Sequence, residues 1–443
     1  MEVVVHPSPP LKGRLWAGGS KNYTSRYVLA ATLAGGESVL HNPALIDDAQ
    51  VMMDCCRRLG AIIEEMPDTA MPLGRQRVLR IKGTDGRMTP PGELNVGNAG
   101  AVARFLMAVA AHLPAPTRFV TPYEHSLGKR PHGDLLQALT QLGCSVSSNQ
   151  GRLPVTIGGG VRQGGRVEVS GAISSQFTSA LLFLAPLLCG ETRITVTGEQ
   201  VSKPLIGQTL RVLSQCGIIL ETDADLRHFV VPGPQPYRAG DYHIPGDWPG
   251  AAAIMAAAAV AGATVTIEGL YGDDGQGEQA MVEVLAAMGA NITFDESGHK
   301  VTVSPAPQSL KAVAFDGDKA TDAVMAMVAA ACLAEGRSRF YNIENIRYKE
   351  SDRISDYCRE LRKLGVEVEE EQDAIVVCGQ PAGYAGGVTL EGHNDHRLLM
   401  GLTVVALRCR QPVRLTGADH ISKSYPAFFT DLISLGANIR ILD

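Results

Sequence analysis

The sequence is poor in aromatic residues and in long apolar runs. Phe, Trp and Tyr make up 5% of its 443 residues. The longest apolar stretch, residues 251–265, is Ala-rich and shorter than the about 20 residues that a membrane-spanning helix needs. The N-terminal residues also lack the apolar core of a signal peptide. We therefore expect a soluble, cytoplasmic protein without a membrane partner.

Cysteine and charge exclude two further classes of protein. The nine cysteines are scattered, without the even count and spacing of a disulfide framework, which favours reduced thiols in the cytosol. The formal net charge of -6 lacks the basic footprint of a nucleic-acid-binding protein, so we expect no nucleic-acid partner. A hydrophobic content of 45% with 19% charged residues is typical of a globular enzyme, and 443 residues are too many for one core.

A two-part pattern recurs six times along the chain. Its first part is a polar or small cap, an Ala/Leu-rich stretch, a Gly or turn, and a β-branched run. Its second part is an amphipathic segment that closes on a hydrophobic residue and Gly, followed by another strand-like run. The period of about 75 residues makes each repeat a supersecondary unit of its own. The order helix, strand, helix, strand, strand predicts an α+β (α/β mixed) fold whose sheets contain both parallel and antiparallel strands. The repeats begin near Ser20, Asn98, Ser174, Asp247, Thr321 and Asn394.

Six repeats divide into two halves of three. Residues 232–243 are rich in turn-forming residues and are the predicted crossing between domains. We predict one domain over residues 17–239 and a second over residues 240–443. The strand-like residues 1–16 precede the first repeat and could pair with either half; we assign them to the second domain.

Cations gather at or just before the predicted helix starts. A helix N-terminus already carries positive potential, so added cations are unfavourable unless an anion lies between them. The pattern therefore predicts binding of phosphate or carboxylate groups. Asp322 and Glu350 lie among these cations and are the kind of carboxylates that proton transfer needs. We predict a site for polyanionic small molecules. The cations are Lys21, Arg26, Arg104, Arg130, Lys349, Arg353, Arg397 and Lys423.

Each motif also has a purely structural interpretation. The segment KESDR (349–353) is typical of a helix start whose acids complement the helix dipole. NDHR (394–397) is typical of an Asn cap with solvated charges, and SSQ (174–176) of a Ser cap. GNAG (97–100) is typical of a turn into a helix. The recurrence of such motifs at the same point of successive repeats favours function over structure alone.

Two other motifs give weaker evidence of function. His393 and His396 have an HxxH spacing, but without further Cys or His ligands nearby we expect no metal site. The glycine-rich segment 158–165 leads into a strand and not a helix, which excludes a dinucleotide-binding loop.

The order of these motifs resembles that of the 5-enolpyruvylshikimate-3-phosphate synthases, which belong to the enolpyruvyl transferases. KESDR followed by NDHR is the specific part of the resemblance, which covers essentially the whole chain. It implies an inside-out α/β barrel: two domains, each of three βαβαββ repeats, with the active site in the cleft between them. The motifs are GSKN…SR (19–26), GNAG…R (97–104), KRP (129–131), SSQF (174–177), SKP (202–204), TDA (321–323), KESDR, NDHR and SKSYP (422–426).

The resemblance implies transfer of the enolpyruvyl group of phosphoenolpyruvate to the 5-hydroxyl of shikimate 3-phosphate, with release of phosphate. The reaction runs by addition and then elimination, without a metal or organic cofactor. We expect a monomer that acts on these two small molecules. Both substrates are polyanions, in keeping with the cations described above.

The resemblance also implies roles for individual residues. Asp322 would be the base for the reacting hydroxyl, and Glu350, assisted by Lys21, would transfer protons at the methylene carbon of phosphoenolpyruvate. The implied phosphoenolpyruvate-binding residues are Lys21, Gly100, Arg130, Gln176, Lys349, Arg353, His396, Arg397 and Lys423. The implied shikimate 3-phosphate-binding residues are Lys21, Asn22, Arg26, Ser174, Ser175, Gln176, Ser202, Asp322, Asn345 and Lys349.

The chain departs from the family pattern at Asn22, Ala101, Phe105 and Leu205. Asn22 keeps open an acceptor such as UDP-N-acetylglucosamine, because the sister transferases also carry a Lys-Asn pair. Their usual Cys is absent from residues 121–129, however. A ring of six α+β units that encircles DNA is a non-enzymatic alternative, but it gives no reason for Asp322 and Glu350 at helix starts.

Overall fold

The computed structural model describes residues 1–67 and 77–442, which form two compact units. The C-terminal-half unit comprises Met1–Gly18 and Pro245–Asp443, and the N-terminal-half unit comprises Gly19–Ile244. The chain therefore passes from one unit to the other after Gly18 and again after Ile244.

The N-terminal-half unit contains three four-stranded sheets, with strand orders β14-β3-β5-β4, β6-β7-β9-β8 and β10-β11-β13-β12. Its strands are β3 (Glu37–His41), β4 (Ile62–Pro67), β5 (Arg77–Lys82), β6 (Glu93–Asn95), β7 (Thr117–Val120), β8 (Val146–Asn149), β9 (Arg152–Ile157), β10 (Arg166–Ser170), β11 (Gly190–Thr197), β12 (Glu221–Thr222), β13 (His228–Gly233) and β14 (Asp241–His243). Its α-helices are α1 (Lys21–Leu33), α2 (Asp47–Arg58), α3 (Gly100–Ala110), α4 (Gly133–Gln141), α5 (Ser175–Leu184) and α6 (Lys203–Gln215).

The C-terminal-half unit repeats this plan, with sheets β16-β17-β15-β2, β18-β19-β21-β20 and β22-β23-β1-β24. Its strands are β1 (Glu2–Val5), β2 (Lys12–Trp16), β15 (Thr264–Glu268), β16 (Asn291–Asp295), β17 (Lys300–Ser304), β18 (Ala314–Asp316), β19 (Gly336–Tyr341), β20 (Glu367–Glu370), β21 (Ile375–Gly379), β22 (Thr389–Glu391), β23 (Val413–Thr416) and β24 (Ile439–Leu442). Its helices are α7 (Trp248–Val260), α8 (Ala280–Ala287), α9 (Val324–Ala331), α10 (Arg353–Lys363), α11 (His396–Ala406) and α12 (Phe428–Ser434), with short 3-10 turns η3 (Gly277–Gln279), η4 (Gly317–Ala320), η5 (Glu344–Tyr348) and η6 (Ala418–Lys423).

The predicted mixed α and β fold of six repeats is confirmed. In five repeats the predicted order of helix, strand, helix, strand, strand is continuous in the chain, as in α3-β7-α4-β8-β9. The sixth repeat ends at β24, and β1 from the start of the chain takes the place of its last strand. The barrel geometry and the position of the active site stay predictions.

The strands that precede α1 and α7 are exchanged between the units. In the second, third, fifth and sixth repeats the strand before the first helix runs parallel to the strand after it, as β6 does beside β7. In the first repeat this place is taken by β14, which pairs with β3. In the fourth repeat it is taken by β2, which pairs with β15. This exchange explains why the N-terminal-half unit extends past residue 239, where the sequence placed the boundary.

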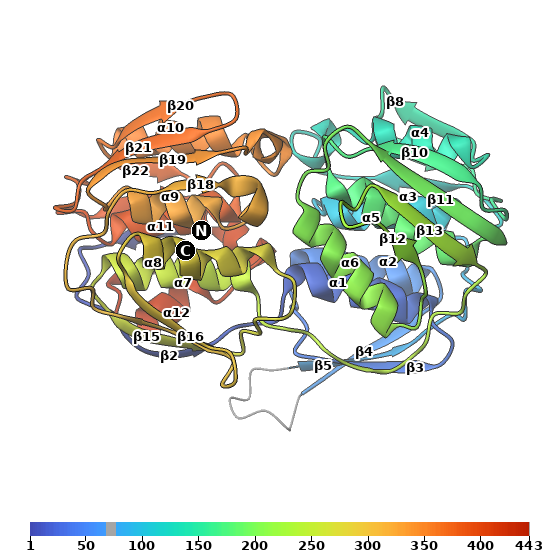
Figure 1. The fold of residues 1–443 in the computed structure, drawn as a ribbon, viewed down its shortest axis with the longest axis horizontal. Helices are drawn as coiled ribbons and strands as arrows, with labels where there is room; N and C mark the ends of the chain where they lie inside the picture. Colours follow the sequence, from blue (N-terminus) through green and yellow to red (C-terminus); the bar gives the residue numbers. More distant parts are fainter. Residues whose placement is uncertain (68–76, 443) are drawn as a thin grey trace. The chain divides into compact units, whose positions relative to one another are not determined.

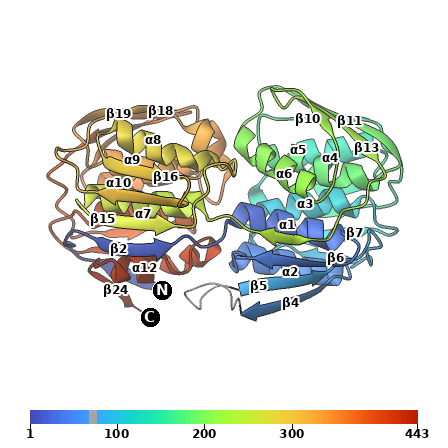
Figure 2. The same ribbon diagram turned by 60° about the horizontal axis from the view of Figure 1, so that its bottom comes forward.

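The first helix of each repeat is largely buried. The sheets lie at the periphery of each unit (Figure 1). In the C-terminal-half unit α7, α9 and α11 pack against one another, and in the other unit α3 packs on α5. The Ala-rich helices α7 and α9 have buried residues on all sides. Their small side chains allow the helix axes to approach closely. Figure 2 shows β2 running beside β15, with which it pairs.

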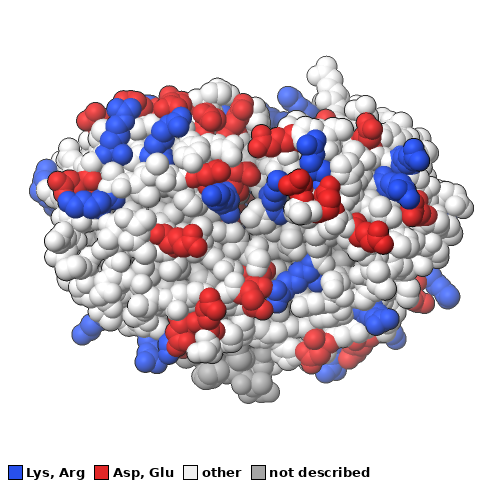
Figure 3. Space-filling view, in the orientation of Figure 1, with Lys and Arg blue, Asp and Glu red and all other residues white. Residues whose placement is uncertain are grey.

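The outer surface carries both signs of charge. Figure 3 shows Lys and Arg interspersed with Asp and Glu across the described residues of the face in view. Arg337 and Arg339 on β19, for example, pair with Glu369 and Glu371 at 2.6 Å. In the described part of the chain, no helix is long and apolar enough to span a membrane.

Candidate active site

A buried cluster in the C-terminal-half unit is built around Arg353, the first residue of α10. Its Nε donates to Asp395 Oδ2 at 2.8 Å. One terminal nitrogen donates to Asp322 Oδ1 at 3.1 Å, and the other donates to Glu350 Oε2 at 2.9 Å. A single guanidinium therefore holds three carboxylates, two of which were predicted as catalytic groups.

The charges of this cluster depend on one another because they are removed from water. The side chains of Arg353 and Asp395 are 2% and 0% exposed, those of Glu350 and Asp322 7% and 13%. Burial by itself lowers the pKa of an arginine, but Asp395, Glu350 and Asp322 outweigh it and raise the pKa of Arg353. Asp322 keeps the largest exposed fraction of the three acids, so it is the one best placed to meet a ligand.

Two further predicted cations contact the same acids. A terminal nitrogen of Arg397 lies 3.8 Å from Asp322 Oδ2, and Lys423 Nζ lies 3.5 Å from Glu350 Oε1. Arg397 is 2% exposed, yet its Nε and that terminal nitrogen have no hydrogen-bond partner among the described residues. Buried donors of a charged group are costly when unsatisfied, so they indicate a place for an anionic ligand.

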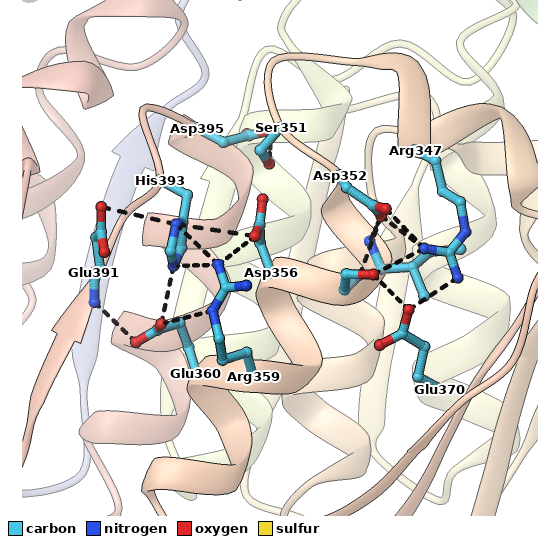
Figure 4. A network of polar contacts seen from close by, with 12 residues as sticks. Arg347, Ser351, Asp352, Asp356, Arg359, Glu360, Glu370, Glu391, His393 and Asp395 are labelled. Carbon is cyan, nitrogen blue, oxygen red and sulfur yellow. Dashed lines mark hydrogen bonds and ion pairs between the residues drawn. The ribbon is translucent and has the colours of Figure 1, made fainter. Parts of the chain in front are cut away.

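The start of α10 sets the spacing of Glu350 and Arg353. Asp352 caps the helix by accepting from the backbone N–H groups of Ile354 and Ser355. Arg347 in turn donates to both carboxylate oxygens of Asp352, as Figure 4 shows. KESDR is therefore both a capped helix start, as its structural interpretation predicts, and part of the polar cluster.

The start of α11 corrects one prediction. The cap is Asp395, whose Oδ1 accepts from the backbone N–H of Arg397 at 2.9 Å, and not Asn394. Asn394 and His393 both have left-handed backbones, with φ of 56° and 47°, so the chain turns sharply just before the cap. The charges of NDHR are buried and not solvated, because the side chains of Asp395 and Arg397 are 0% and 2% exposed. His396 between them is buried as well, and its Nδ1 lies 3.9 Å from Asp395 Oδ1.

Two more predicted residues lie on η5 and just after it. Asn345 is buried and donates from Nδ2 to Asp318 Oδ1 on η4 at 3.0 Å. Lys349 is half-buried and directly precedes Glu350. Both therefore belong to the segment that leads into the cluster.

The N-terminal-half unit has its own buried cation cluster. Arg104 on α3 donates from one nitrogen to Ser174 Oγ at 3.0 Å and to Gln176 Oε1 at 2.7 Å. Its other terminal nitrogen donates to the carbonyl of Pro131 at 3.2 Å. Ser174 also caps α5 by accepting from the N–H of Gln176, so the predicted cap is confirmed.

Gly100, at the first position of α3, lies against a second cation. A Cβ built at Gly100 would be 2.8 Å from a terminal nitrogen of Arg130 and 3.7 Å from Gln176 Oε1. Arg130 is 7% exposed. The absence of a side chain at Gly100 therefore lets a buried guanidinium approach the helix N-terminus closely.

The remaining predicted residues of this half lie on or beside α1 and α6. Lys21 Nζ is 3.4 Å from Asp48 Oδ2 on α2. Arg26 is fully buried, and burial lowers its pKa to about 10. Its nitrogens donate to Thr209 Oγ1 and to the carbonyls of Asn22 and Leu205. Ser175 and Ser202 are buried as well. Arg26 therefore contacts α6, whereas Arg104 contacts the start of α5.

Sequence reasoning missed two acids of the site. Asp395 lies inside the NDHR motif, but only the fold shows that it faces Arg353. Glu278 on η3 is 4% exposed, and its Oε1 accepts from the backbone N–H of Asp322 at 3.3 Å. Burial, followed by the charge of Asp322, raises the pKa of Glu278 to about 7. No pattern in the segment around Glu278 signals this contact.

A second polar network joins Glu360 of α10 to His393, which precedes α11 (Figure 4). Glu360 is buried, and it accepts from His393 Nε2 at 2.9 Å, from the N–H of Glu391 and from Lys363. Burial alone would raise the pKa of Glu360, but these contacts outweigh burial and lower that pKa to about 2. The bond to Glu360 raises the pKa of His393. His393 is thus engaged by a carboxylate, and the described residues include no cluster of His, Cys, Asp and Glu that could hold a metal ion.

The pair of His393 and Glu360 makes stability depend on pH. A raised His393 pKa stabilises the fold below the ordinary pKa of about 6.5, and this contribution is lost as the pH rises through the folded value. A lowered Glu360 pKa stabilises it above about 4.3, and this contribution is lost as the pH falls toward the folded value. We expect His393→Gln to lower the free energy of unfolding by about 1 kcal/mol near pH 5.5 and by less near pH 9.

Urea unfolding followed by tryptophan fluorescence measures this, because Trp16 and Trp248 both lie in the C-terminal-half unit. His420→Gln is the control, since His420 makes only a 3.8 Å contact with the exposed Asp419. An equal loss at both pH values in His393→Gln would contradict the prediction.

Comparison with known proteins places the chain in one family. The family model described as EPSP synthase (3-phosphoshikimate 1-carboxyvinyltransferase) matches residues 5–432. A 3-phosphoshikimate 1-carboxyvinyltransferase of Deinococcus radiodurans is 48% identical over 99% of this chain and 97% of its own length. One from Burkholderia pseudomallei is 37% identical over 99% and 95%. The solved EPSP synthase from Acinetobacter baumannii shares the fold, with a TM-score of 0.81 at 23% identity over the full length of both chains.

Proposed function

The chain belongs to the EPSP synthase family, and we propose that the two buried cation clusters described above hold the anionic substrates of the family's reaction. That reaction transfers the enolpyruvyl (1-carboxyvinyl) group to shikimate 3-phosphate in the shikimate pathway of aromatic amino acid biosynthesis, so the protein is a transferase. The relatives' shared name supports this acceptor and not UDP-N-acetylglucosamine.

The arrangement around Arg353 carries the proposal. Its two terminal nitrogens hold Asp322 on one side and Glu350 on the other, at 3.1 and 2.9 Å. Two carboxylates that serve opposite proton transfers need such a fixed separation, because each must reach a different atom of the reacting pair. Ion pairs with Arg397 and Lys423 hold each carboxylate from a second side.

We assign the proton transfers as follows. Asp322 accepts the proton of the 5-hydroxyl while that oxygen bonds to C2 of phosphoenolpyruvate. Glu350, assisted by Lys21, delivers a proton to C3, which gives a tetrahedral intermediate. In the elimination, the C3 proton returns to Glu350, the C2–C3 double bond forms again, and the bond from C2 to the phosphate oxygen breaks while the phosphate takes up the proton held by Asp322. Phosphate leaves, so atoms and charge balance without a cofactor.

Phosphoenolpyruvate carries a phosphate and a carboxylate, and cations from both halves of the sequence are assigned to it. Two buried Arg397 nitrogens have no hydrogen-bond partner among the described residues, which supports this assignment, as does the close approach of Arg130 to Gly100. Binding the anion would satisfy those donors and offset the repulsion among the cations. The assigned residues are Lys21, Gly100, Arg130, Gln176, Lys349, Arg353, His396, Arg397 and Lys423.

Shikimate 3-phosphate is assigned to polar residues of α1, α5 and the start of α6, together with Asp322, Asn345 and Lys349. Arg26 belongs to this set although it already bonds within the fold. A guanidinium has five N–H donors, and the three hydrogen bonds described for Arg26 use one donor of each nitrogen. The other residues are Lys21, Asn22, Ser174, Ser175, Gln176 and Ser202.

Phosphate release is the direct test. We expect release when the protein is mixed with phosphoenolpyruvate and shikimate 3-phosphate, and none when UDP-N-acetylglucosamine replaces the second substrate. Asp322→Asn should lower kcat by about 100-fold or more, because general base catalysis contributes on that order. Asp373→Asn is the matched control, since Asp373 is an exposed aspartate of the same half. Full activity in Asp322→Asn would overturn the assigned base.

Gly100→Ala tests the binding assignment separately. The new Cβ would lie 2.8 Å from the Arg130 guanidinium, which must move. We expect KM for phosphoenolpyruvate to rise about tenfold, a loss of about 1.4 kcal/mol, with little change in KM for shikimate 3-phosphate. Steady-state kinetics in both substrates measure the two constants.

Gly207→Ala is the control for this substitution, because a Cβ at Gly207 on α6 meets open space. It should leave both constants unchanged. If Gly100→Ala also leaves them unchanged, Arg130 does not bind phosphoenolpyruvate in the assigned way. We also propose that the protein acts as a monomer, in the cytoplasm and without a cofactor. This part of the proposal rests on the sequence alone.

A further inference from the structure

Glu278 is a buried acid that the assigned mechanism does not use. It lies on η3, between α7 and α8, and its Oε1 is bonded to the backbone N–H of Asp322. The neighbouring residues fix this turn. Gln276 donates to the Gly246 carbonyl at 2.8 Å and to Asp274 Oδ2 at 2.7 Å, and it accepts from the N–H of Trp248. The Glu278 carboxyl is therefore held in place beside the proposed base.

The two acids differ in what stabilises a negative charge on them. Asp322 faces Arg353 at 3.1 Å and Arg397 at 3.8 Å. Glu278 is buried away from solvent, and this burial, followed by the charge of Asp322, raises its pKa. The charge of Arg397 and the hydrogen bond from the Asp322 N–H oppose this rise. Burial and the neighbouring Asp322 charge therefore favour the protonated form of the Glu278 carboxyl, relative to an ordinary glutamate.

The other charged residues on the elements packed against η3 are few. Among the described residues they are Asp247 at the start of α7, Asp316 at the start of η4, Asp318 and Lys319 on η4, and Glu283 on α8. Asp273 and Asp274 lie in the loop before η3.

We infer that Glu278 is a positioning residue that fixes the backbone of Asp322 and, through its own ionisation, sets how strongly Asp322 binds a proton. The inference rests on the proposed role of Asp322 as the base. When Glu278 ionises, a second negative charge appears next to Asp322, and Asp322 becomes a stronger proton acceptor. Addition to phosphoenolpyruvate should then be faster above the pH at which Glu278 ionises.

Glu278→Gln separates the two parts of this role. Gln keeps an oxygen that can accept from the Asp322 N–H, but it cannot ionise. We expect the single-turnover rate of the variant to match that of the wild type within about twofold at pH 6. The wild-type rate should then rise about threefold more than the variant's rate between pH 6 and pH 8.5.

Glu283→Gln is the matched control, because Glu283 is an exposed acid on α8, and its profile should follow that of the wild type. A Glu278→Gln profile that parallels the wild type, at full or at uniformly reduced rate, would overturn the inference. Uniform reduction would leave Glu278 with a structural role only.

A measurement on the resting enzyme keeps the inference testable if the variant is poorly folded. Carbon-13 NMR of protein labelled at its glutamate carboxyls should show one carboxyl that titrates near neutral pH. This titration should move to lower pH in Asp322→Asn, because the neighbouring charge is gone. The absence of a neutral-range titration would overturn the inference. Activity retained in Asp322→Asn would instead overturn the proposed function, whatever the NMR result.

Discussion

The buried guanidinium of Arg353 is the interaction on which the site depends. It satisfies Asp395, Asp322 and Glu350 at once, in a place where none of these charges could stay ionised alone at low cost. Replacing it would leave three acids to share the remaining cations, Arg397 and Lys423, which contact only two of them. The orientation of the proposed base and acid is therefore a consequence of one side chain at the start of α10.

The fold supplies the elements that make this possible. Each repeat begins with a buried helix, and the helices α9 and α11 pack together so that Asp322 and Asp395, just before their starts, both reach Arg353 on α10. Helix N-termini favour nearby carboxylates, which explains why Asp395 can be both a cap and an ion-pair partner. The cations then offset those acids and leave the buried Arg397 donors for an anion.

Much of this was predictable from local patterns. The six repeats, the caps at Ser174 and at the KESDR segment, and the grouping of cations with Asp322 and Glu350 follow from helix signals and charge placement. The strands that β2 and β14 pair with were not, because parallel pairing between distant strands leaves no signature in either segment. The structural interpretation of NDHR gave the cap to Asn394 and solvated the charges, because Asn and Asp are about equally good caps. Glu278 was missed because its partner is a backbone N–H, which no side-chain pattern reveals.

A double-mutant cycle between Arg353 and Asp395 tests the central claim most directly. Urea unfolding would be followed by tryptophan fluorescence, since both tryptophans lie in the C-terminal-half unit. Arg353→Met should cost about 3–5 kcal/mol, because it leaves buried acids uncompensated. Asp395→Asn keeps a capping side chain but removes the charge, so the double variant should lose at least about 1 kcal/mol less than the two single losses combined. Strictly additive losses would contradict the view that Arg353 and its carboxylates form one charge-coupled unit.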